Sequence, residues 1–101
     1  MSTEAALRAL AEPRRQAILR LVREPRAVGE IASHFDITQQ AVSQHLQVLR
    51  EAGLVTVTKQ GQRRLYVVHP DGLELLHAFL SELWPAGLER LKQSIESADA
   101  G

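Results

Sequence analysis

The spacing of the apolar residues changes twice along this chain of 101 residues, and that change limits the possible folds more than any other feature. Up to Gly53 the apolar residues recur at helical spacing. From Leu54 to Val68 they follow the period of a β-strand, and after Pro70 the helical spacing returns. This pattern predicts a mainly α fold with one small β-hairpin, in the order α-α-α-α-β-β-α.

Four helices are expected before the hairpin. The first covers residues 5–10, and the second begins at Pro13, because a proline fits the first turn of a helix. The second helix ends at Glu24, since the residue before a proline avoids helical backbone angles. The third helix is short and covers residues 28–35.

The fourth helix has the clearest signals and covers residues 39–52. Thr38 is a favourable N-cap, and Gly53 is the type of residue that most often ends a helix. Its apolar face, at positions i, i+4 and i+7, consists of Val42, Leu46 and Leu49. The opposite face is uncharged but can both donate and accept hydrogen bonds, and it consists of Gln40, Ser43, Gln44 and Gln47.

The hairpin is expected to have strands at residues 54–59 and 65–68, joined by a turn at residues 60–63. Gly in that turn allows a positive φ. Three cations and no acid flank it: Lys59, Arg63 and Arg64. A short helix, a tight turn and a longer helix with a polar face make a helix-turn-helix, and a basic hairpin after it is a wing. Cations on a wing suit DNA phosphates or a narrow minor groove.

A last helix is expected from Pro70 to about residue 96, with a kink or break near Ser81 caused by Pro85. Its apolar residues are Leu73, Leu76, Leu80, Leu83, Trp84, Leu88, Leu91 and Ile95. The preceding elements already fill the core of so small a domain. The surplus of large apolar side chains therefore predicts burial against a second copy of the chain.

Charge is distributed unevenly, although the formal net charge is zero. Residues 1–68 hold ten Lys and Arg against six Asp and Glu, whereas residues 69–101 hold two against six. The first two-thirds of the chain therefore carries a local positive field, which favours a polyanionic partner such as DNA.

Several common functions are not expected. The chain has no cysteine, which excludes a disulfide framework, a thiolate metal site and a thiol nucleophile. No apolar run approaches the length of a membrane-spanning helix, and the N-terminus lacks the features of a signal peptide, so we expect a cytoplasmic protein without a membrane partner. No phosphate-binding loop, paired-carboxylate motif or nucleophile–base signature is present, so we do not expect an enzyme.

Four segments resemble the ArsR-type bacterial winged-helix repressors. Residues 10–19 (LAEPRRQAIL) are similar to the family's opening L-x-x-P-x-R-x-x-I-L, and residues 28–32 resemble its scaffold helix. Residues 41–55 (AVSQHLQVLREAGLV) are very similar to its recognition-helix signature, and residues 61–66 resemble its wing. The resemblance implies a homodimeric repressor of an inverted-repeat operator in double-stranded DNA, with the first and last helices forming the dimer interface.

On this interpretation residues 1–101 form one winged helix-turn-helix domain, with the helix-turn-helix at 28–52, the wing hairpin at 54–68 and dimerisation helices at 1–10 and 70–96. The recognition helix, 39–52, lies in the major groove, and the wing, 59–64, lies on the backbone or minor groove. The candidate DNA contacts are Arg15, Thr38, Gln39, Gln40, Ser43, Gln44, Gln47, Lys59, Arg63 and Arg64. The candidate dimer contacts are Leu7, Leu10, Leu76, Leu80, Leu83, Trp84 and Leu88.

The chain departs from the metal-sensing members of that family. They carry Cys-x-Cys in the third helix, where this chain has residues 28–31 without cysteine, and Asp-x-His on the last helix, where it has Asp71-Gly72-Leu73. We therefore expect no metal and no cofactor. Two alternatives stay open. One is a metal- or small-ligand-responsive repressor, in which His77, Asp71 and Glu74 bind zinc across a dimer. The other is a winged-helix module that binds another protein.

Overall fold

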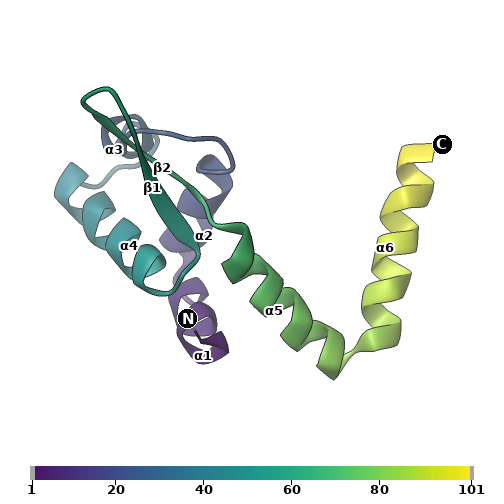
Figure 1. Ribbon diagram of the computed structural model, residues 1–101. Coiled ribbons are helices and arrows are strands. Elements are labelled where there is room, and N and C mark those ends of the chain that lie inside the picture. The colour runs from purple at the N-terminus through teal and green to yellow at the C-terminus, as the bar shows by residue number, and fades with distance from the viewer. Residues whose placement is uncertain (1, 101) are drawn as a thin grey trace.

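The computed structural model describes the backbone of residues 2–100, and the side chains of that range other than Leu88, Leu91 and residues 97–100. In this range the chain forms six helices and two strands (Figure 1). In chain order they are α1 (Thr3–Leu10), α2 (Pro13–Leu21), α3 (Val28–Ala32), α4 (Gln39–Glu51), β1 (Val55–Gln60), β2 (Arg63–Val68), α5 (Pro70–Leu83) and α6 (Pro85–Ala100). The predicted fold class is confirmed, but the last predicted helix is in fact two.

The predicted fourth helix is confirmed, to within one residue, as α4. The Thr38 hydroxyl accepts a hydrogen bond of 3.0 Å from a backbone N–H in the first turn, which caps the helix. Its inner residues Val42, Leu46 and Leu49 are completely buried. Gly53 follows the helix with a φ of 79°, a backbone conformation that other residues rarely adopt.

The core lies among α1 to α4, the first residues of the hairpin and Leu76 of α5. Its largest completely buried residues are Ile18, Val22, Ile31, Val42, Leu46, Leu49, Leu54 and Val55. α1 contributes the small residues Ala6 and Ala9, whereas Leu7 is 42% exposed. α1 begins at Thr3, earlier than predicted, because the Ser2 hydroxyl caps it by accepting a hydrogen bond of 3.1 Å from the helix.

The second and third helices end earlier than predicted. The Val22 carbonyl accepts a hydrogen bond of 2.9 Å from β2, and Arg26 pairs with Tyr66 through two backbone hydrogen bonds of 3.0 and 2.8 Å. After α2 the chain turns at residues 22–24 and then bridges to β2 at Arg26, so it does not continue as a helix. α3 ends at Ala32, and residues 33–37 form a turn followed by a bend.

The hairpin turn is tighter than predicted. β1 and β2 are antiparallel, and Gln60 pairs with Arg63, which leaves only Gly61 and Gln62 in the turn. Gly61 has a φ of 65°, as a two-residue hairpin turn requires. Arg63 and Arg64 are therefore strand residues, and their side chains point in directions set by the strand.

The predicted bend in the last helix is a complete break at Trp84, just beyond the expected position near Ser81. Trp84 has a φ of −148° and a ψ of 68°, because the residue before Pro85 does not stay helical. The Trp84 ring covers Gly87, where a Cβ atom would lie 1.8 Å from the ring. Figure 1 shows α5 leading away from the other elements and α6 turning back at a sharp angle. We call α5 and α6 together the arm.

The start of the arm touches the backbone that follows α4. The His69 N–H donates a hydrogen bond of 2.9 Å to the Leu54 carbonyl. A Cβ atom at Gly72 would lie 2.2 Å from the Gly53 carbonyl oxygen, so only a glycine permits this approach. We call the contact between Gly72 and Gly53 the joint. It places the first turn of α5 directly against the end of α4.

Candidate nucleic-acid interface

The outer face of α4 presents polar side chains to solvent. The exposed residues of this row are Gln40, Ser43, Gln44 and Gln47, and Thr38 and Gln39 are exposed at the start of the same helix. The row lies opposite the buried face, so α4 can enter a groove of DNA without disturbing the core. An α-helix fits the major groove, and amide and hydroxyl groups can form hydrogen bonds with base edges there.

The two adjacent arginines of the wing point to opposite faces of the hairpin, because side chains alternate along a strand. Arg63 forms an ion pair with Glu30 of α3. Arg64 instead lines a groove that the hairpin forms with α4. Sequence reasoning missed Glu30, because the hairpin itself contains no acid and the partner comes from an element far away in the sequence.

The groove between α4 and the hairpin has a volume of about 670 Å³, and its lining residues are Ser43, Gln47, Arg50, Glu51, Arg64 and Tyr66. Gln47 donates a hydrogen bond of 3.2 Å to the Glu51 carboxylate. Arg50 is not among the predicted DNA contacts. A signal for it was present, since Arg50 follows Ser43 by seven residues and so lies on the same side of the helix.

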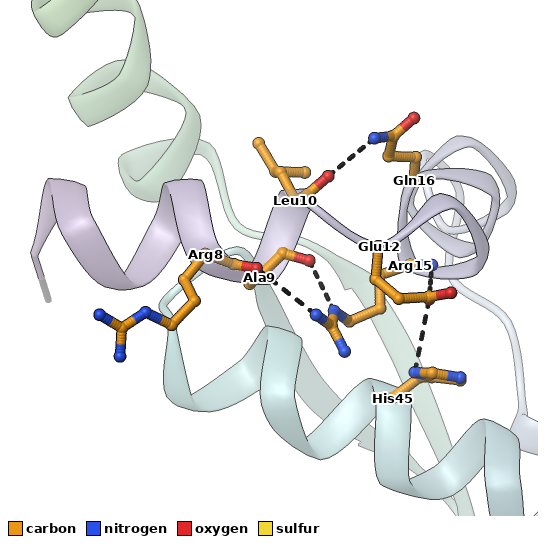
Figure 2. A network of polar contacts seen from close by, with 7 residues as sticks. All are labelled: Arg8, Ala9, Leu10, Glu12, Arg15, Gln16 and His45. Atoms are coloured by element: carbon orange, nitrogen blue, oxygen red, sulfur yellow. Dashed lines mark hydrogen bonds and ion pairs between the residues drawn. The ribbon is translucent and has the colours of Figure 1, made fainter.

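Arg15 binds the end of α1, as Figure 2 shows. Its Nε donates a hydrogen bond of 2.6 Å to the Ala9 carbonyl, and an Nη donates one of 3.4 Å to the Arg8 carbonyl. Gln16 donates one of 2.7 Å to the Leu10 carbonyl. The last carbonyls of a helix have no partner within it, so these bonds fasten α1 to α2. The DNA contact of Arg15 stays a prediction.

Glu12 connects α2 with α4 (Figure 2). Its Oε2 accepts a hydrogen bond of 3.1 Å from the Arg15 backbone N–H and lies 3.8 Å from Nδ1 of His45 on α4. Partial burial raises the pKa of Glu12. The backbone hydrogen bonds from Arg14 and Arg15, together with the charges of His45 and Arg15, outweigh that effect and hold the pKa below its ordinary value.

The candidate dimer contacts divide between the surface and the core. The large exposed ones on the arm are Leu80 at 48%, Leu83 at 67% and Trp84 at 62%. Leu7 is exposed on α1, which packs against α5. Leu76 is buried in the protein's own core, and Leu10 is half-buried against it. The side chain of Leu88 lies outside the described part of the structure.

Within residues 2–100 no helix is both long and apolar enough to cross a membrane. In the same described part of the chain, no three His, Asp or Glu side chains come together as the ligands of a metal ion do. Asp71, Glu74 and His77 are exposed on α5. His77 also lines a hollow between α5 and α6, together with Ser81 and Glu89. Zinc shared between two copies therefore stays a hypothesis for experiment.

The helix-turn-helix part of the chain matches a known protein family. Residues 10–58 match the family described as Helix-turn-helix domain, and they contain α2, α3 and α4. The chain is also similar to the HTH-type transcriptional regulator Rv2034 of Mycobacterium tuberculosis. The two are 42% identical over 97 residues, which cover 95% of this chain and 91% of that protein.

Two solved structures share the fold over most of the chain. The crystal structure of a possible transcriptional regulator for arsenical resistance has a TM-score of 0.71 and 40% identity, and the match covers 88% of this chain and 94% of that one. The second is the homodimeric winged helix-turn-helix DNA-binding domain Mb0332 of Mycobacterium bovis, a possible ArsR-family transcriptional regulator. It has a TM-score of 0.66 and 30% identity, over 79% of this chain and 76% of that one.

Proposed function

This chain belongs to the ArsR family of winged helix-turn-helix transcriptional regulators, and we propose that it is a homodimeric repressor of an inverted-repeat operator in double-stranded DNA. In each protomer α4 enters the major groove, and the wing lies beside it on the backbone or the minor groove. A dimer seated there covers DNA that RNA polymerase needs, which is how binding becomes repression. A DNA partner of this kind puts the proposed site of action in the cytoplasm.

The observation that carries the proposal is the uncharged polar row on α4. A surface helix usually exposes charged side chains. α4 instead exposes the uncharged row Gln40, Ser43, Gln44 and Gln47, and its charged residues Arg50 and Glu51 lie in the last turn. A glutamine amide can donate to and accept from one adenine, so this row can distinguish bases. The nearby cations Lys59 and Arg64 add attraction to phosphates that does not depend on sequence.

The exposed apolar side chains of the arm support a dimer. Leu80, Leu83 and Trp84 form a surface that water solvates poorly, and a second copy of the same surface can cover it. A two-fold axis through that contact gives two α4 helices, one for each half of the operator. Dimeric helix-turn-helix proteins read half-sites about one DNA turn apart, or a multiple of it, so the operator is expected to be an inverted repeat.

Selection of bound sequences from a random pool of double-stranded DNA tests the proposal. We expect an inverted repeat to be enriched, and footprinting of the promoter beside the protein's own gene then locates a natural copy. The recovered duplex is titrated by fluorescence anisotropy, with a scrambled duplex as the control. If folded protein enriches no duplex, the proposal fails and the alternative of a protein-binding module gains support.

The same titration decides between metal-independent and metal-responsive repression. We expect equal operator affinity with a chelator and with added zinc, because the chain lacks cysteine and the Asp-x-His pattern. A tenfold change in affinity contradicts metal independence. In that case His77→Ala is the first variant to measure, with Asp71 and Glu74 as the accompanying ligand candidates.

A further inference from the structure

The groove between α4 and the hairpin brings two cations together from separate elements. Arg50 comes from the last turn of α4, and Arg64 comes from β2. Ser43 and Gln47, members of the polar row on α4, line the same groove. The groove therefore lies directly beside the side chains that face the bases.

The hairpin register adds a third cation on the same side. Lys59 is directly opposite Arg64 in the antiparallel pair, so their side chains share one face of the hairpin. Arg63 occupies the other face and is paired with Glu30. Within the described part of the chain, the ion pairs join Arg8 with Glu4, His45 with Glu12 and Arg63 with Glu30. The cations of the groove take part in none of them.

The wall of the groove is held in place by the backbone. The backbone N–H of Tyr66 donates a hydrogen bond of 2.8 Å to the Arg26 carbonyl, and the Tyr66 carbonyl accepts one of 3.0 Å from the Arg26 N–H. The acid in the groove, Glu51, accepts a hydrogen bond from Gln47 at 3.2 Å. This hydrogen bond occupies part of the Glu51 carboxylate, whereas Arg50 and Arg64 are exposed residues.

These observations point to an anionic occupant with several hydrogen-bond acceptors, and we propose that the groove holds a stretch of DNA backbone whose phosphates contact Arg50 and Arg64 from two sides. The inference rests on the proposed function and makes it more specific. Guanidinium groups bind phosphate oxygens through paired, charge-assisted hydrogen bonds. Contacts of this kind set the register of the protein on the duplex, while the neighbouring row of α4 reads the bases. Arg63 is paired with Glu30 on the opposite face of the hairpin and is not part of this phosphate site.

The salt dependence of operator affinity tests the inference. Each phosphate contact contributes about 0.9 to the slope of log affinity against log salt concentration. A dimer loses two such contacts when one arginine is replaced. We therefore expect Arg50→Gln and Arg64→Gln each to lower the magnitude of the slope by about 2. Circular dichroism of each variant verifies that it is folded.

Two controls separate a phosphate contact from a general loss of charge. Arg20→Gln removes an exposed arginine of α2 that does not line the groove. Glu4→Gln with Arg8→Gln removes the exposed ion pair of α1, which lies outside the groove, without a change in net charge. Both controls are expected to keep the slope of the unmodified protein. The inference is overturned if either control lowers the slope as much as Arg64→Gln does, or if Arg50→Gln leaves it unchanged.

Ethylation interference identifies the contacted phosphates directly. Ethylation of a phosphate removes its charge, so positions that block binding of the unmodified protein mark its contacts. We expect at least one such position in each half-site to stop interfering with Arg64→Gln and with Arg50→Gln. An unchanged pattern in both variants contradicts the inference while leaving the proposed function intact. If the unmodified protein binds no operator, it is the proposed function that fails.

Discussion

The carboxylate of Glu12 acts on two helices at once. It caps the first turn of α2 and pairs with His45, a residue of the helix proposed to read DNA. The side chains of α4 that face solvent make no comparable contact with α2. Glu12 is therefore the residue that links α2 with α4 in the network of Figure 2.

Glu12→Gln is expected to lower the Tm at neutral pH, because it removes the charge that caps the first turn of α2. The pKa of Glu12 is lower in the folded protein than its ordinary value of 4.5. The stabilisation is therefore fully present above that value and is lost as the pH falls through the folded pKa. Thermal melts between pH 7 and pH 3 should show the two proteins converging at the acid end. An equal difference at every pH contradicts a role for the charge.

Gln44→Ala is expected to lower specificity and not general attraction to DNA. The loss of a base contact costs roughly 1–3 kcal/mol at the cognate operator and much less on random duplex. The salt slope should stay the same, because no phosphate contact is removed. Gln93→Ala makes the same change on the exposed surface of α6 and serves as the control. Equal losses on operator and random DNA would remove Gln44 from the base-reading row.

At the scale of elements, the sequence predicts best where local and tertiary preferences agree. α4 has a cap at Thr38, an apolar stripe and a terminal glycine, and all three fit its place in the core. The end of α2 was predicted wrongly, because backbone pairing of Arg26 with Tyr66 outweighs the local helix signal. The polar row on α4 was predictable from spacing. The pairing of Arg63 with Glu30 was not, since it depends on how α3 packs beside the hairpin.

Gly72→Ala is expected to weaken the joint between α5 and α4. The new Cβ atom would lie 2.2 Å from the Gly53 carbonyl oxygen and 2.8 Å from its carbon, and backbone cannot move away as a flexible side chain can. Overpacking of this kind costs about 1–3 kcal/mol in the free energy of unfolding. Urea denaturation measures the loss.

Gly29→Ala is the matched control for that substitution. Gly29 lies in α3, and a Cβ atom there has nothing within 4 Å. Alanine in a helix is more stable than glycine by roughly 0.5–1 kcal/mol, so this variant is expected to gain stability. The interpretation of the joint is wrong if both alanine variants are equally stable.

The whole molecule consists of a packed winged part and an arm that extends from it. The arm contacts the rest through α5, which packs against α1 and contributes Leu76 to the core, and in Figure 1 α6 stands apart from α1 to α4. The exposed leucines of the arm and Trp84 were predictable as a surplus of apolar residues. The break at Trp84 was predictable from Pro85 only as a kink, because its direction depends on how the Trp84 ring packs over Gly87.

Leu80→Asp is expected to turn a dimer into a monomer. Sedimentation of the unmodified protein should give twice the chain mass of 11.2 kDa, and the variant should give that mass once. A charge in an apolar contact is costly, whereas Leu80 is 48% exposed in the single chain, so the fold itself should persist. Ala78→Asp places the same charge on the opposite side of α5 and should leave the dimer intact. A monomeric unmodified protein at micromolar concentration contradicts the proposed assembly.

The joint at Gly72 has a consequence for the operator itself. In the proposed dimer, α5 belongs to the interface and also rests on the end of α4 at the joint. The angle between the two α4 helices therefore depends on this contact, together with the packing of α5 on α1 and of Leu76 in the core. The DNA double helix turns by about 34° per base pair, so one base pair more or less between the half-sites rotates them by that angle relative to each other. A change at Gly72 is thus expected to alter the preferred length of the spacer, while the bases read within each half-site stay the same.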